Sequence, residues 1–184
     1  VSYTDITVQE NSTITVINFQ DETQANINFL CCHLKTNAKL SLWTIGLGNK
    51  FSSHVQEIHF DGNDAFCDNH TLYFGKDNDH SDYFVRHIHE GRGGKSEINS
   101  HGILKDKAYA RYDGMIDIRQ TGAQTDASLD EKTLLMSETA RVEAVPGLEI
   151  GTNDVKAGHS AGITRIDDEQ LFYAAARGIQ QKEA

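Results

Sequence analysis

The sequence predicts an all-β fold, and three observations point to it. Segments of four or five residues that are rich in β-branched and aromatic side chains recur along the chain. Asn, Asp, Gly and Ser, the residues that favour turns, separate these segments. Helical periodicity is nearly absent before residue 166. With 184 residues, the chain has the length of one domain that can bury a core without disulfide bonds.

Six segments are the clearest candidates for strands. In chain order they are 13–17, 39–43, 71–74, 83–86, 115–118 and 140–143. Few of the joins between them carry hairpin signals, and Pro146 is the single proline, which favours stacked parallel rungs over long hairpins. A β-sandwich or a small barrel stays open on these observations alone. If parallel rungs form over residues 1–155, six apolar side chains should point inward: Ile14, Val16, Leu40, Leu42, Ile116 and Ile118.

Alanines mark the starts of several of these strands. Each follows a polar turn, and the four are Ala38, Ala65, Ala108 and Ala140. The intervals between them are 27, 43 and 32 residues. A solenoid repeats one structural unit at a nearly constant period, so these intervals are too irregular to establish one.

One helix is predicted near the end of the sequence, over residues 168–177. Asp167 is a good N-cap, and Gln170 completes a capping box with it. Gly178 can adopt the left-handed backbone conformation that ends a helix. Both ends of this helix are therefore specified by local residues.

The composition narrows the range of partners. A net charge of −10, from 27 acidic and 17 basic residues, disfavours nucleic acid and anionic membrane surfaces, because both would repel the chain. No apolar run approaches the ~18 residues of a membrane-spanning helix, and the residues after Val1 do not resemble a signal peptide. The adjacent Cys31 and Cys32, with Cys67 as an odd third cysteine, indicate a reducing compartment. We therefore expect a cytoplasmic protein that binds other proteins.

The last quarter of the chain carries its most specific motif. The motif has four parts: PGLEI at 146–150, DVKAGH at 154–159, DDEQLFY at 167–173 and RGI at 177–179. It resembles the C-terminal signature of the SufB/SufD family, the scaffold proteins on which iron–sulfur clusters are assembled, and it matches the SufD branch better than the SufB branch. The likeness continues upstream through GILKDKA at 102–108 and AQTDA at 123–127. About half of the chain, roughly residues 100–180, carries the resemblance.

This resemblance implies a right-handed parallel β-helix core over residues 1–165 and the start of a C-terminal helical region over 166–184. It also implies that the chain is a fragment, because family members continue into further helices. The implied function is that of a non-catalytic scaffold subunit of the SUF complex, which pairs with a SufB-like protein and binds the SufC-like ATPase. Without these partners, we expect a homodimer through an edge strand near 142–150, since exposed strand edges recruit other strands.

His159 is the candidate site residue. Small residues surround it, in the order Ala157, Gly158, Ser160 and Ala161, and they leave the imidazole uncrowded. The resemblance implies that this histidine faces a cysteine of the SufB-type partner, and that it is a metal ligand of a transient iron–sulfur cluster shared by the two proteins. No cluster is expected on the isolated chain. Many SufD sequences have cysteine in place of Ala157, so a local thiol is lost here. From the residues alone, a hydrogen-bonded turn histidine is the alternative.

The segment 130–136 matches the region of SufB that carries a cysteine, but it contains none. The resemblance therefore implies that this chain does not accept sulfur by that route. Glu131 falls at about the position of that cysteine. We interpret it as a solvated turn carboxylate rather than as an iron ligand.

Histidines form a second possible metal group, made of His80, His87, His89 and His101. Two of them, His87 and His89, would share one face of a strand and could bind an ion together. An exposed strand produces the same spacing by accident, which is the simpler interpretation. Cys31 and Cys32 follow apolar residues and are interpreted as buried small hydrophobic side chains.

A carbohydrate-active β-helix lyase or hydrolase is the alternative function. It would use carboxylates such as Asp61, Asp64 and Asp68 as acid, base or calcium ligands. Fold alone does not separate the two functions. The signature around His159, the cysteine usage and the absence of a visible secretory segment favour the scaffold.

Overall fold

The computed structural model of the protein describes residues 1–20, 25–48, 50–166, 172–173 and 175–178. These residues contain twelve strands. In chain order the strands are β1 (Ser2–Val8), β2 (Thr13–Gln20), β3 (Asn26–Leu34), β4 (Lys39–Leu47), β5 (Ser52–Phe60), β6 (Phe66–Gly75), β7 (His80–His89), β8 (Lys95–Leu104), β9 (Tyr109–Ile118), β10 (Asp126–Leu135), β11 (Arg141–Ile150) and β12 (Lys156–Arg165).

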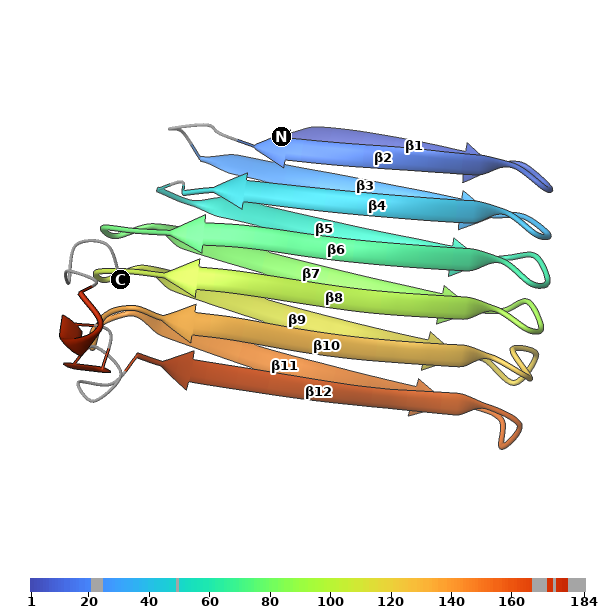
Figure 1. The fold of residues 1–184 in the computed structure, drawn as a ribbon. Coiled ribbons are helices and arrows are strands. Elements are labelled where there is room, and N and C mark those ends of the chain that lie inside the picture. The colour runs from blue at the N-terminus through green and yellow to red at the C-terminus, as the bar shows by residue number, and fades with distance from the viewer. Residues whose placement is uncertain (21–24, 49, 167–171, 174, 179–184) are drawn as a thin grey trace.

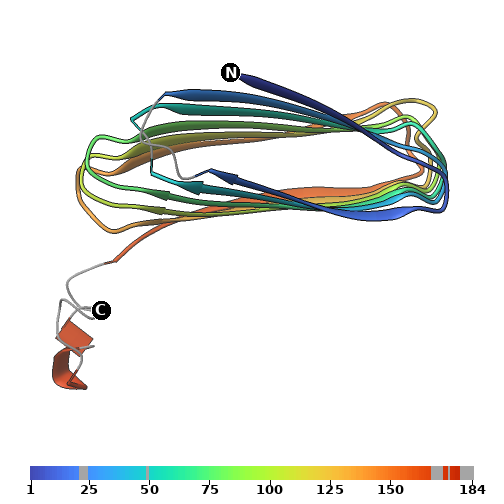
Figure 2. The same ribbon diagram turned by 90° about the horizontal axis from the view of Figure 1, so that it is seen from above.

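The chain alternates between two six-stranded sheets (Figure 1). Sheet A has the order β1-β3-β5-β7-β9-β11, and sheet B has the order β12-β10-β8-β6-β4-β2. All ten neighbouring pairs in these sheets are parallel. Each coil therefore consists of one odd-numbered and one even-numbered strand, and the coils stack into a flattened solenoid whose two sheets face each other in Figure 2. The expected parallel β-helix is confirmed.

The strands are longer and more numerous than the sequence suggested. They contain seven to ten residues each, and six of them (β1, β3, β5, β8, β10 and β12) are not among the expected segments. β10 illustrates why such strands were missed. Its inward positions include Ala127 and Leu129, but the outward positions between and beyond them, such as Asp126 and Lys132, are polar, so the segment as a whole does not look apolar. A strand whose outer half is charged does not look apolar in the sequence.

The irregular alanine spacing also has a structural explanation. Ala38 and Ala65 precede β4 and β6 in sheet B, whereas Ala108 and Ala140 precede β9 and β11 in sheet A. The intervals of 27 and 32 residues are therefore single coils, and the interval between the two pairs is longer because it crosses from one sheet to the other. All four alanines are fully buried at the corners of the coils.

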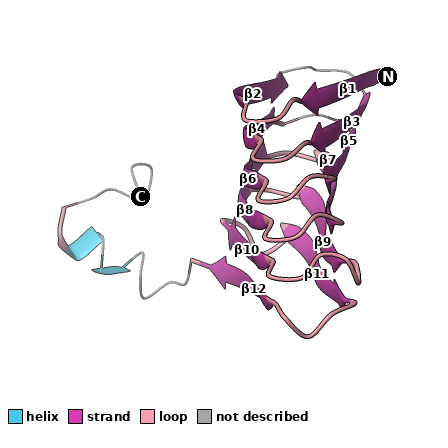
Figure 3. Ribbon diagram, turned by 90° about the vertical axis from the view of Figure 1, so that its right-hand side faces the viewer, coloured by secondary structure: helices cyan, strands magenta, loops and turns pink. Residues whose placement is uncertain are grey.

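The turns that lead from odd to even strands stack on one another (Figure 3). The residue two positions before β2, β4 and β6 has a positive φ in each case: Asn11, Asn37 and Asp64. Asn and Asp tolerate the left-handed region better than other non-glycine residues. At the equivalent position before β8 the chain has Gly93, with φ 71°. The same tight turn is thus built repeatedly from different residues.

The interior contains two apolar clusters, one in the early coils and one in the late coils. The expected inward positions are confirmed: Leu40, Leu42, Ile116 and Ile118 are buried, and Ile14 and Val16 pack against the early cluster while remaining partly exposed. Buried polar side chains also line the middle coils, among them His54, Gln56, Asn69 and His87.

The expected helix over 168–177 lies only partly within the described residues. Its proposed start at Asp167, with the capping box, lies outside them. Residues 172–173 and 175–176 are helical. Gly178 has a φ of 86° and donates its N–H to the carbonyl of Ala175 at 3.0 Å, which confirms the expected helix stop. No helix in the described part of the chain has the length and apolar character needed to cross a membrane.

Candidate functional site

The end of the solenoid at β11 and β12 is open. Each of these strands pairs with one neighbour only, β9 and β10 respectively. The backbone donors and acceptors on their other sides face no further strand of the described chain. Pro146 lies in β11, and an edge strand is where a strand proline is tolerated, because the ladder needs donors on one side only.

His159 lies on this open end, in the middle of β12. It is in register with Leu129 of β10, whose side chain is buried in the interior. The imidazole therefore continues an inward-facing column, yet it is exposed because no later coil of the described chain covers it. His159 is part of a strand rather than of a turn, and its role as a metal ligand stays a prediction.

The backbone around His159 is accessible. A side chain placed on Gly158 would meet no atom within 4 Å, and one on Gly162 would meet none closer than 3.9 Å. Two apolar side chains on the same open end, Ile150 and Ile163, are about half exposed at 47% and 52%. Another protein could thus approach this strand closely and cover apolar surface there.

Glu131 lies on β10, opposite Ala161 of β12. It is fully buried, and the hydroxyls of Tyr73 and Thr133 donate hydrogen bonds to its Oε1, the first at 3.2 Å. Its Oε2 has no hydrogen-bond partner among the described residues. Burial raises the pKa of Glu131, although the hydrogen bonds from Thr133 and Tyr73 oppose the rise. The interpretation of Glu131 as a solvated turn carboxylate is therefore wrong, because the alternation of β10 directs its side chain inward.

We expect Glu131→Gln to become progressively more stable than the wild type as the pH rises. A group with a raised folded-state pKa contributes stability below its unfolded pKa, and that contribution is lost as the pH rises through the folded value. Glutamine keeps the shape and the acceptor but cannot ionise. Chemical denaturation from about pH 4 to about pH 8 measures the difference in free energy of unfolding.

Asp130→Asn is the matched control for this prediction. Hydrogen bonds from Lys132 and Ser160 lower the pKa of Asp130, so its contribution has the opposite sign and appears as the pH rises. The asparagine variant should therefore lose stability relative to the wild type as the pH rises towards about 4, the ordinary pKa of Asp, so the control series extends down to about pH 2. If the difference in free energy of unfolding between Glu131→Gln and the wild type did not change with pH, or changed in the same direction as that of Asp130→Asn, the raised pKa of Glu131 would be contradicted.

The interior of the middle coils holds uncharged histidines. Asn69 Nδ2 lies 3.2 Å from both Gln56 Oε1 and His87 Nε2. Neither ring nitrogen of His54 has a hydrogen-bond partner in the described part of the chain. Burial lowers the pKa of His54 to about 4 and that of His89 to about 3, and it places the pKa of His87 well below its ordinary value. These imidazoles are neutral at physiological pH.

The four histidines proposed as a metal group are not brought together. His87 and His89 do share one face of β7, but that face is the buried interior. His80 lies on the outer face of sheet A and His101 on the outer face of sheet B. The interpretation of His87 and His89 as an exposed strand face is therefore wrong, and the four side chains cannot share one ion.

The adjacent cysteines Cys31 and Cys32 lie on opposite faces of β3. Cys32 is buried, as expected, and burial raises its pKa to about 12. Cys31 is only partly buried on the outer face of β3, so the expectation is wrong for this residue. Of the aspartates proposed for a carbohydrate enzyme, Asp61 and Asp64 lie in the connection between β5 and β6, and Asp68 lies on the outer face of β6 in the other sheet.

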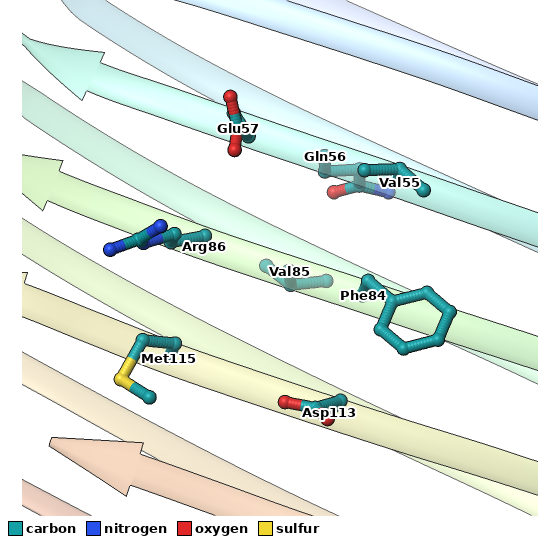
Figure 4. A pocket seen from close by; sticks show the side chains of 8 residues that line it. All are labelled: Val55, Gln56, Glu57, Phe84, Val85, Arg86, Asp113 and Met115. Atoms are coloured by element: carbon teal, nitrogen blue, oxygen red, sulfur yellow. The ribbon is translucent and has the colours of Figure 1, made fainter.

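A shallow depression of about 330 Å³ lies on the outer face of sheet A (Figure 4). Val55, Phe84 and Met115 supply its apolar lining, while Glu57 and Arg86 supply charged groups. It lies on β5, β7 and β9, in the sheet opposite the one that carries the candidate histidine. The depression is therefore separate from the open end.

Comparisons with known proteins match the whole chain to one family. A family model described as SUF system FeS cluster assembly, SufBD core domain, covers residues 1–184. The iron-sulfur cluster assembly protein SufD of Bacillus subtilis (strain 168) is 32% identical over 145 residues, which are 77% of this chain and 33% of that protein. SufD of Escherichia coli (strain K12) is 44% identical over 82 residues, which are 45% of this chain and 19% of that protein.

A plant relative aligns over almost the entire chain. Protein ABCI7, chloroplastic, of Arabidopsis thaliana is 25% identical over 186 residues, which cover 98% of this chain and 38% of that protein. The chain thus spans about a third of the length of the B. subtilis SufD and less of the E. coli one. The likeness that the C-terminal signature suggested extends over the first hundred residues as well. The chain belongs to the SufB/SufD family of iron–sulfur cluster assembly proteins, and its relatives place it on the SufD side of that family.

Proposed function

We propose that this chain is a SufD-type scaffold of the SUF machinery, not itself catalytic, whose open end pairs with a SufB-type protein around a nascent iron–sulfur cluster. The exposure of His159 on the terminal strand carries the proposal. A second solenoid that stacked its own first coil on this uncovered coil would cover the inward-facing positions of β12. His159 would then lie between the two proteins.

The open end has the features of a strand-pairing interface. β11 and β12 present unpaired backbone groups, and exposed edges of this kind are readily extended by another strand. Ile150, Ile163 and Val145 are exposed on the same two strands and would be covered by a partner. In the absence of SufB, two copies of this chain would pair through the same edge as a homodimer.

His159 would supply one nitrogen ligand to the cluster, which is cargo of the complex rather than a resident cofactor. Imidazole is a suitable ligand for iron, and histidine replaces cysteine in some iron–sulfur centres. The SufB-type partner would supply thiolate, since the described strands at this end contain no cysteine. The SufC-type ATPase would bind elsewhere in the complex, which we place in the cytoplasm.

A charge on the open end should prevent pairing. We expect Ile163→Glu to reduce co-purification of the SufB-type protein by at least about tenfold, because burying an unpaired carboxylate in an interface is strongly unfavourable. The wild-type residue is half exposed, so the fold should be unchanged. The measurement is affinity purification of the co-expressed proteins, with the melting temperature of the isolated variant as a fold check.

Ile103→Glu is the matched control, because Ile103 is 40% exposed on the outer face of β8, in the middle of sheet B. This variant should retain the SufB-type protein. In the isolated chain, light scattering should show a homodimer that Ile163→Glu disrupts. Equal retention of the partner by both variants would reject the open end as the interface.

A further inference from the structure

We propose that Cys31, His33 and His59 form a binding site for a divalent metal ion of the Zn²⁺ class on the outer face of sheet A. The three residues belong to the neighbouring strands β3 and β5 (Figure 1). Their donor atoms all lie within 4.8 Å of one another. This site is distinct from the open end, because His159 lies in sheet B.

The register between β3 and β5 brings the three metal-binding side chains together. Cys31 and His33 are two positions apart on β3, so both side chains point to the outer face. The pairing of β3 with β5 places His59 beside His33 and Glu57 beside Cys31. Four neighbouring positions on one face therefore carry side chains with metal-binding atoms. All four are partly exposed, so an ion can reach them from solvent.

The distances are close to those that a tetrahedral ion requires. Zn²⁺ bound by one thiolate and imidazoles keeps its ligand atoms about 3.3 to 3.8 Å apart. Cys31 Sγ and His33 Nε2 are already 3.5 Å apart. The ring of His59 stacks on that of His33 with centroids 4.8 Å apart. A small rotation of the His59 side chain brings its nitrogen into the same coordination sphere.

A carboxylate outside the cluster orients His33. Nδ1 of His33 lies 3.1 Å from Asp61 Oδ2, and Lys35 Nζ donates to the same oxygen at 2.9 Å. When the Nδ1 proton is donated to Asp61, the lone pair on Nε2 is free and faces Cys31. Histidines that bind metal ions usually donate their other ring N–H to a carboxylate in this manner.

Glu57 can supply the fourth ligand, since its Oε2 lies 3.7 Å from His59 Nε2. One thiolate and one carboxylate together balance the charge of a divalent cation, and the thiol of Cys31 releases its proton on binding. Thiolate and imidazole ligands favour Zn²⁺ over Mg²⁺ or Ca²⁺, which prefer oxygen. The ion would link two successive coils of the solenoid.

The test is a Co²⁺ titration of the metal-free chain, because a thiolate bound to Co²⁺ gives a charge-transfer band in the near ultraviolet. We expect one equivalent of Co²⁺ to develop this band and Zn²⁺ to displace it. Cys31→Ser should abolish the band. Asp61→Asn should weaken Zn²⁺ binding about 10- to 100-fold, and His59→Gln should weaken it further.

His70→Asn is the matched control. His70 is a partly exposed outer-face histidine of sheet B, 2.8 Å from Asp68 Oδ1 and stacked on Trp43, with no cysteine beside it. Its replacement should leave the Co²⁺ band and Zn²⁺ affinity unchanged. Circular dichroism shows whether each variant is folded, and His59→Gln carries the test if Cys31→Ser unfolds. A wild-type chain without the band, a band that survives Cys31→Ser, or an equal loss in the His70 variant would overturn the proposal.

Discussion

Replacing His159 by alanine should remove most of the iron and acid-labile sulfide from the complex assembled with SufB-type and SufC-type proteins, while the chain itself remains folded. The imidazole is exposed on a terminal strand, so its loss opens no core cavity. The cost in stability should stay below the ~2 kcal/mol typical of a large core deletion. A cluster held between two proteins loses a ligand that no cysteine of β11 or β12 can replace.

The experiment combines thermal unfolding of the variant with iron and sulfide analysis of the reconstituted complex. His101→Ala is the control, because His101 is exposed on the outer face of β8, away from the open end, and its replacement should leave the cluster content unchanged. Wild-type cluster content in the His159 variant would eliminate the ligand role. A large drop in melting temperature would identify His159 as a structural histidine instead.

Acidification should destabilise the chain strongly below about pH 6.5, the ordinary pKa of histidine. Burial lowers the folded-state pKa of His54 to about 4 and that of His89 to about 3. A depressed folded-state pKa gives a contribution that is fully present above the unfolded pKa and lost as the pH falls through the folded value. At ~1.4 kcal/mol per pKa unit, His54 alone accounts for about 3 kcal/mol. His87 and His89 add to the same loss.

His54→Phe tests the contribution of one of these histidines. His54 stacks on Tyr83 with ring centroids 4.8 Å apart, an arrangement that phenylalanine can keep. The variant cannot bind a proton, so its free energy of unfolding should fall less steeply between about pH 6.5 and about pH 4 than that of the wild type. Denaturant titrations at several pH values measure this slope. Parallel slopes for the two proteins would show that His54 is not buried in its neutral form.

The alternation of strands and turns, and the family signature at the end of the chain, are readable in the sequence because they depend on neighbouring residues. Local propensity specifies a strand such as β4, the turn at Asn37 and the helix stop at Gly178. The same reasoning missed β10 and β12, because polar outward positions in one and glycines in the other hide the alternation. Glu131 was also assigned to the solvent and Cys31 to the interior, because the face of each side chain depends on a strand alternation that its neighbours hide.

The sequence by itself determined the all-β class, and its family signature determined the family, the expected parallel β-helix and the choice of His159, since each of these depends on a pattern of residue types along the chain. Only the tertiary structure decided which distant residues meet. His33 and His59 are 26 positions apart, and nothing in either segment indicates the other. They become neighbours because parallel pairing of successive coils aligns β3 with β5. The exposure of His159 likewise depends on the stacking of coils, because the same inward-facing position is buried at Leu129, one coil earlier.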